Sequence, residues 1–131
     1  ALAKAVDSIY PGNYQKFYDL WASHIKFFVD YTVAAKGGDA AGMNKAVQNL
    51  GGYIDGAADF FSKANPNLPR EAVKTLVTEH VMLLKGAVDE YGKKNYQGSY
   101  QKQHEAYDQI GKIADALAGA IVKQYPDKFS K

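Results

Sequence analysis

The chain has 131 residues, of which 47% are hydrophobic and 23% charged, a composition typical of one globular domain and not of a disordered chain. Its 16 basic residues are scattered among 14 acidic ones and leave a net charge of only +2. This argues against a nucleic-acid-binding surface, which needs clustered Lys and Arg. The absence of cysteine excludes disulfides, thiolate metal sites and cysteine nucleophiles, and no apolar run is long enough to predict a transmembrane helix.

The first half of the chain predicts two long helices. Residues 1–12 lack the charged region and long apolar core of a signal peptide, and are compatible with a mature or excised N-terminus. A first helix is expected over about 13–36, because apolar residues recur there every three or four positions and Gly37-Gly38 follows. Asp39 is a good N-cap, so a second helix is expected over about 39–64.

The second half repeats this organisation. The connector NPNLP at 65–69 is rigid, and its last proline suits the first turn of a third helix over about 69–92. Asn95 is a plausible cap for a fourth helix over about 95–124. Short connections between long helices make neighbours antiparallel, so the sequence predicts an all-α, up-down-up-down four-helix bundle that forms one domain over 1–131.

The two halves also resemble each other in sequence, which predicts a duplicated helical hairpin. One constant shift along the chain aligns two histidines and two helix caps, and a shift one helical turn longer aligns two glycines and two aspartates. The aligned pairs are His24 with His80, Asp39 with Asn95, Gly51 with Gly111, and Asp55 with Asp115.

This pattern points to a polar centre in the bundle. His24 and His80 lie at equal depth in the first and third helices, so both imidazoles are expected in one layer. A glycine in mid-helix costs about 1 kcal/mol relative to alanine, so Gly51 and Gly111 are expected to make room for packing. Asp55 and Asp115 follow one turn later. We interpret the four polar residues as a buried, hydrogen-bonded His/Asp core.

The alternatives are a small-ligand cavity, histidines that are partly exposed, and a metal site. His24 and His80 with Asp55 and Asp115 would be a ligand set for a copper, zinc or iron ion. The phase of the helices weakens this alternative, because both aspartates lie at the flank of their apolar stripes.

Other kinds of site find little support. A carboxylate-bridged di-iron bundle needs Glu-x-x-His on two helices, and no Glu here is followed three residues later by His. No serine occupies a nucleophile elbow, and there is no phosphate-binding glycine loop. An enzyme that uses the His/Asp centre for acid–base chemistry would need a solvent-accessible pocket. His104 lies among polar residues and is expected on the surface.

Several segments carry a resemblance to a known family: LWASHI at 20–25, FFSKANPNLP at 60–69, EHV at 79–81 and AYDQIGKIADALAGAIVKQYPDKF at 106–129. With these segments the chain resembles helical-bundle modules of secreted or cell-surface proteins of spore-forming Gram-positive bacteria. Such proteins are often labelled copper amine oxidase-like, a label that usually belongs to a neighbouring domain.

This resemblance implies an extracellular or cell-surface location, and makes the two histidines and Asp115 family features, with Asp55 less secure. The chain departs from the family pattern at Leu68, where a tryptophan is usual, and near Tyr53, where an asparagine is usual. The resemblance implies no established activity.

The sequence therefore predicts a non-enzymatic structural or interaction module of a secreted protein, with no cofactor. Its partner would be another protein or a neighbouring domain, and not a nucleic acid. The alternative is a metal-binding bundle that uses the two histidines and one or two aspartates.

Overall fold

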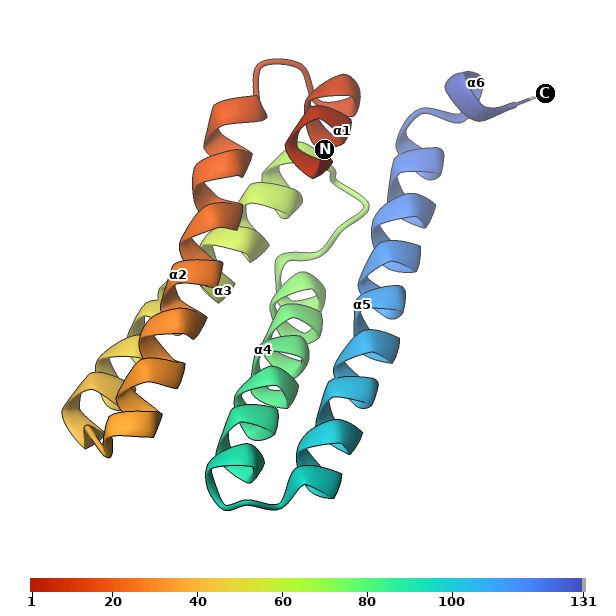
Figure 1. The fold of residues 1–131 in the computed structure, drawn as a ribbon. Helices are drawn as coiled ribbons and strands as arrows, with labels where there is room; N and C mark the ends of the chain where they lie inside the picture. The colour runs from red at the N-terminus through yellow and green to blue at the C-terminus, as the bar shows by residue number, and fades with distance from the viewer. Residues whose placement is uncertain (131) are drawn as a thin grey trace.

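The structure is a computed structural model that describes residues 1–130, and over these residues it is all α-helical (Figure 1). The four predicted helices are present as α2, α3, α4 and α5, and their antiparallel order confirms the up-down arrangement. Two short helices were not predicted. In chain order the helices are α1 Leu2–Ile9, α2 Tyr14–Gly37, α3 Ala40–Ala64, α4 Arg70–Gly92, α5 Tyr96–Gln124 and α6 Pro126–Phe129. None of these helices is long and apolar enough to cross a lipid bilayer.

The long helices begin and end within one residue of the prediction because local signals define their ends. The side chain of Asp39 accepts a hydrogen bond from the backbone N–H of Gly42 at 2.9 Å, and Asn95 does the same for Gly98 at 3.0 Å. Gly38, with a φ of 69°, ends α2 in the left-handed conformation that glycine adopts without strain. The duplication of the helical hairpin stays a prediction.

The first turn of α2 is capped by a different helix. Asn13 stands at the N-cap position, but its side chain makes no cap hydrogen bond. Instead the carboxylate of Asp7, on α1, accepts hydrogen bonds from the backbone N–H groups of Asn13 at 2.9 Å and Tyr14 at 3.0 Å. A negative charge at a helix N-terminus is also favoured by the helix dipole. Asp7 therefore fixes α1 to the start of α2.

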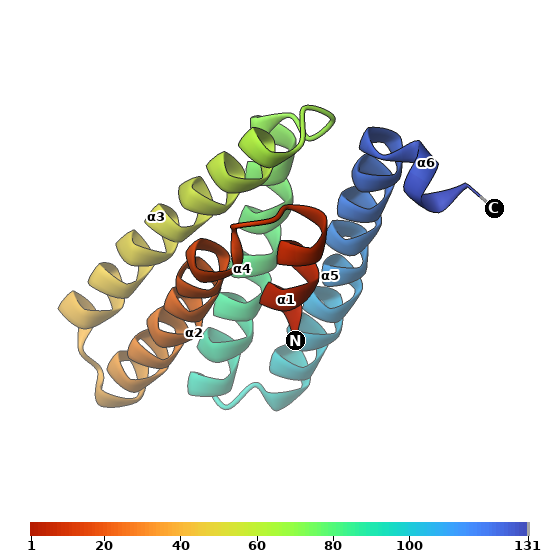
Figure 2. The same ribbon diagram turned by 90° about the horizontal axis from the view of Figure 1, so that it is seen from above.

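The four long helices do not close into a ring. Packed pairs form between α2 and α3, between α3 and α4, and between α4 and α5, and α2 also contacts α4. A closed bundle would in addition pack α2 against α5, and within residues 1–130 these two helices form no such interface. Viewed from above, α1 lies between α2 and α5 (Figure 2). One side of the bundle is thus covered partly by α1.

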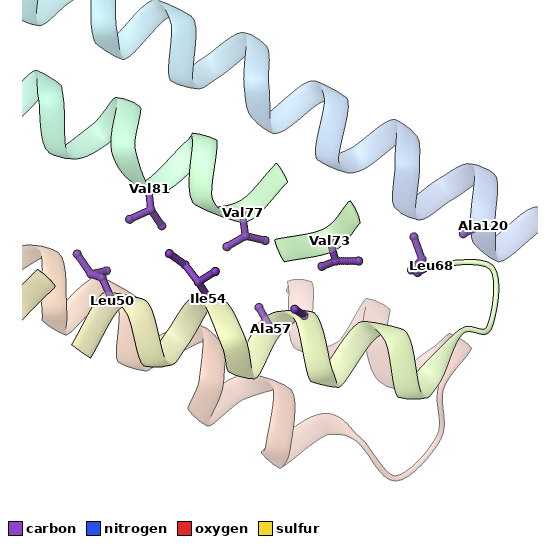
Figure 3. Close-up of a cluster of buried hydrophobic side chains, with 9 residues drawn as sticks. Leu50, Ile54, Ala57, Leu68, Val73, Val77, Val81 and Ala120 are labelled. Atoms are coloured by element: carbon purple, nitrogen blue, oxygen red, sulfur yellow. The ribbon is translucent and has the colours of Figure 1, made fainter. Parts of the chain in front are cut away.

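The main hydrophobic core lies between α3 and α4 (Figure 3). It is built from side chains that recur every three or four residues on each helix, as an amphipathic helix requires. Its labelled members are Leu50, Ile54, Ala57, Leu68, Val73, Val77, Val81 and Ala120. A second cluster at the start of the chain packs Ala3 of α1 against Phe17 of α2 and Phe60 of α3. The burial of Leu50, Ile54 and Ala57 confirms the apolar stripe of the second predicted helix.

A polar network joins three chain segments at the end of the molecule that carries α1, which we call the upper end (top of Figure 1). Asn65, which is fully buried in the connector between α3 and α4, donates a hydrogen bond to the Tyr10 hydroxyl at 3.0 Å. The Tyr10 hydroxyl donates to Gln124 of α5 at 3.2 Å, and Gln124 donates to the backbone carbonyl of Ala64 at 3.1 Å. Asn65 also accepts from the backbone N–H of Asn67 at 2.9 Å.

The lower end, which carries the α2–α3 and α4–α5 turns, has a smaller polar contact, which we call the lower tie. The hydroxyl of Tyr31, a residue of α2 that is only 1% exposed, donates to the carboxylate of Asp89 on α4 at 2.5 Å. Lys85 donates to the other oxygen of that carboxylate at 2.7 Å, and its ammonium group lies 5.1 Å from the centre of the Tyr31 ring. This contact joins α2 directly to α4.

Candidate binding site

The predicted buried His/Asp core is wrong. The Asp55 side chain is 50% exposed and forms ion pairs with Arg70 at 3.1 Å and Lys74 at 2.8 Å, and Asp115 is exposed on α5. The reason is helix phase: buried Ile54 points into the core, so its neighbour Asp55 turns toward the start of α4. The two cations hold the pKa of Asp55 below its ordinary value. Neither aspartate joins the histidines.

The predicted metal ligands are therefore not brought together. Across residues 1–130, no group of three or more His, Cys, Asp or Glu side chains is placed to hold a metal ion. His24 and His80 do come close, but the ligand set of two histidines with Asp55 and Asp115 is not assembled.

Gly51 and Gly111 do not make room for a packed neighbour, contrary to the prediction. A Cβ atom added at Gly51 or Gly111 would meet nothing within 4 Å, so neither glycine makes room for a neighbour. The close approach occurs at Gly56, where a Cβ atom would lie 3.0 Å from a methyl carbon of Leu20. This glycine lets α2 and α3 pack closely.

Two hollows lie along the open side between α2 and α5. The first, which we call the upper cavity, has a volume of about 210 Å³ and lies beneath Leu2 and Val6 of α1. The second, which we call the lower groove, has a volume of about 650 Å³ and runs between α2 and α4 toward the α4–α5 turn. His24 lines both hollows.

Both histidines line the upper cavity, as their equal depth in the helices predicted. The Nδ1 of His24 is hydrogen-bonded to the backbone carbonyl of Trp21. Because a carbonyl can only accept, Nδ1 carries the proton and Nε2 of the neutral ring is left as an acceptor. Burial lowers the pKa of His24, and the nearby His80 lowers this pKa further against the opposing effect of the Trp21 carbonyl. His24 is therefore uncharged at neutral pH.

Two aromatic residues surround His24, and sequence reasoning did not identify them as part of the site. The His24 ring stacks on Tyr53 of α3 with the ring centres 4.8 Å apart. It also packs edge-to-face with Trp21, with the ring centres 4.7 Å apart. The sequence did contain a signal, because Trp21 and His24 are one helical turn apart. Tyr53 was not predicted because it lies on α3 and meets His24 of α2 only in the folded structure.

His80 has an unused hydrogen-bonding atom. Its Nδ1 is buried and has no hydrogen-bond partner among residues 1–130. Burial lowers the pKa of His80, and the backbone of Ala106 on α5 partly opposes this effect. Tyr53 lines the same cavity, and burial raises the pKa of its hydroxyl to about 12. Most buried polar groups in proteins are hydrogen-bonded, so unused ones beside a cavity indicate a place for water or a ligand.

The lower groove is lined mainly by apolar side chains. On α2, Ile25, Val29 and Val33 stand four residues apart and are 53%, 55% and 66% exposed. The opposite side is formed by Val88 and Tyr91 of α4. An aligned row of exposed aliphatic side chains differs from the scattered apolar residues normal on a protein surface, and such a patch marks an interaction site.

The remaining predicted surface residue lies where expected. His104 is exposed on α5, where its ring packs edge-to-face with Tyr100 and the ring centres lie 5.7 Å apart. It lines neither hollow.

No protein-family model, no curated protein and no solved structure matches this chain. The resemblance to secreted helical-bundle modules therefore stays a prediction.

Proposed function

We propose that this domain is a non-enzymatic interaction module that binds an amphipathic helix of a partner protein or neighbouring domain in the lower groove. The observation that carries the proposal is the exposed row of Ile25, Val29 and Val33 beside an apolar groove of about 650 Å³. Helix-in-groove recognition uses such a surface, in which apolar residues of the incoming helix enter between two helices.

The dimensions of the groove suit a short helix. The row begins at Ile25 and ends at Val33, eight positions further along α2, which is a length of about 12 Å at 1.5 Å per residue. A partner helix of two to three turns would cover it, with apolar residues at three- and four-residue spacing.

The chain itself supplies an example of this kind of packing. α1 is a short helix with Ala3 and Val6 on its apolar face, and both pack against the cluster that contains Phe17 and Phe60. It lies between α2 and α5, further along the same open side (Figure 2). This supports an amphipathic helix, and not an extended peptide, as the segment that covers the rest of that side.

The lining of the groove bears on the partner class. No Lys, Arg, Asp or Glu is among its lining residues, and recognition of nucleic-acid phosphates would require clustered basic residues. We therefore propose a protein partner. An extracellular or cell-surface location is part of the proposal and rests on the sequence resemblance alone.

The test is a selection of amphipathic helical peptides of about 14 residues against the wild-type domain, followed by binding measurements on one variant pair. Val29→Glu puts a charge in the groove and is expected to abolish binding of the selected peptides. Val122→Glu is the matched control, because it makes the same substitution at a valine of α5 that is 47% exposed and lies outside both hollows. It is expected to bind like the wild type.

Two results would contradict the proposal. Peptides that bind Val29→Glu and wild type equally would place the interaction elsewhere. A wild-type dimer that Val29→Glu converts to a monomer, measured by sedimentation equilibrium, would show that a second copy of the chain covers the groove.

A further inference from the structure

We propose that the upper cavity is a binding site for a small, uncharged aromatic molecule that carries a hydroxyl or N–H group, such as a phenol. This site is separate from the helix-binding groove and does not depend on it. The proposal rests on the volume of the cavity, its aromatic lining and its unused polar atom.

The volume sets the size of the ligand. An engineered apolar cavity of about 150 Å³ in another protein is large enough to bind benzene. At about 210 Å³ the upper cavity has room for one ring with a substituent, or for a small fused pair of rings. A long acyl chain would not fit inside it.

The lining favours an aromatic ligand. Phe17, Trp21, Tyr53 and Phe61 all border the cavity, together with aliphatic side chains such as Val81. Aromatic rings pack against one another edge-to-face or offset, with a gain beyond the area they bury. The stack of His24 on Tyr53 and the edge contact of Trp21 already show such packing in the cavity wall.

The polar lining favours a hydroxyl or N–H group on that ring. One buried lining atom, Nδ1 of His80, has no hydrogen-bond partner in the described chain, and the Tyr53 and His24 side chains line the same cavity. A ligand hydroxyl can donate to Nδ1 of His80 when this nitrogen carries no proton and accept from it when it does, so it can satisfy either tautomer.

The ligand should be uncharged. Neither Lys, Arg, Asp nor Glu lines the cavity, so nothing there would balance a charge on a ligand. Burial keeps both histidines in their neutral form at pH 7, since the pKa of each lies below its ordinary value. A benzoate-like anion would therefore be excluded.

The cavity borders the lower groove at His24, and α1 covers it with Leu2 and Val6.

The experiment is an NMR titration of the wild-type domain with phenol, toluene and benzoate at pH 7.5. Phenol is expected to bind and to shift the signals of Tyr53 and His80. Toluene, which has the same ring without a hydroxyl, is expected to bind roughly tenfold more weakly because it leaves the polar atom unsatisfied. Benzoate is expected not to bind.

Two variants locate the site. Ala114→Phe fills the cavity from an exposed lining position on α5 and is expected to abolish phenol binding without loss of the fold. His80→Phe keeps a ring in place and removes the hydrogen bond, so phenol should then bind no better than toluene. His104→Phe is the matched control for a histidine outside the cavity, and Val29→Glu should leave phenol binding unchanged.

Several results would overturn the proposal. If phenol does not bind, the cavity holds water only. If phenol binds Ala114→Phe as well as it binds wild type, it binds elsewhere. If toluene binds the wild type as tightly as phenol, the polar atom does not select the ligand. Urea unfolding of each variant verifies that lost binding is not lost folding.

Discussion

The upper and lower ends of the open side differ in what covers them. At the upper end, α1 lies over the side, and buried Asn65 links the α1–α2 turn, the connector after α3 and the end of α5. At the lower end, one tyrosine–carboxylate contact joins α2 to α4, and Val33 and Tyr91 remain exposed. The space between α2 and α5 is thus covered at the upper end and open at the lower end.

The missing α2–α5 interface is therefore not simply loose packing. Where the chain supplies its own amphipathic helix, the side is covered and the Asn65 network ties the chain segments there together. Where the chain supplies none, aliphatic side chains of α2 stay in solvent. The unsatisfied polar atom, Nδ1 of His80, lies between the two ends, in the upper cavity.

The largest effect is expected from loss of the upper network. Asn65→Ala should lower the free energy of unfolding by about 2–3 kcal/mol, because it removes a fully buried side chain and leaves the backbone N–H of Asn67 without its acceptor. Urea unfolding measures this change. Asn67→Ala is the control, since only the backbone of Asn67 takes part, and it should change stability by less than about 0.5 kcal/mol.

Loss of the lower tie should cost less. Tyr31→Phe removes the hydroxyl that donates to Asp89 but leaves the carboxylate paired with Lys85 and the Lys85 cation over the ring. We expect a loss of about 1 kcal/mol by urea unfolding. Tyr14→Phe, at a partly exposed tyrosine, should have almost no effect. A Tyr31→Phe loss larger than that of Asn65→Ala would reverse our ranking of the two ends.

The smallest effect is a pH dependence that originates between the two ends. The pKa of both His24 and His80 is lower in the folded state than the ordinary value of 6.5. Below about pH 6.5 the unfolded chain therefore binds more protons than the folded chain, and stability should fall as the pH drops toward the folded pKa values. Urea unfolding between pH 7.5 and about pH 5 measures this slope.

The double variant His24→Gln/His80→Gln separates the histidines from the carboxylates that titrate at lower pH. Its stability should depend less on pH over this range than that of the wild type. Equal slopes for the two proteins would show that the histidines are not the source.

The long helices could be predicted from sequence because the signals that define them are local. Asp39 and Asn95 cap their helices through backbone groups three residues away, and apolar spacing identifies the buried faces. α1 was missed although Leu2, Ala3, Val6 and Ile9 have helical spacing, because an eight-residue helix is marginal without the packing that only the fold supplies.

The centre of the site was harder to predict. Depth along a helix, which is set by residue number, correctly placed His24 and His80 in one cavity. Direction around the helix depends on how the helices are rotated in the bundle, and here it turned Asp55 toward Arg70. The partner of His24 is Tyr53, and no local rule relates residues on α2 and α3 that meet only in the folded structure.

The cap that Asp7 provides has a further consequence for local unfolding. Because α2 has no side-chain cap of its own, any opening that lifts α1 also frees the first backbone N–H groups of α2. α1 and the first turn of α2 should therefore exchange their amide hydrogens as one cooperative unit. Since Leu2, Val6 and Phe17 line the upper cavity, this unit is also a part of its wall, and the protection of those amides reports how often the cavity opens.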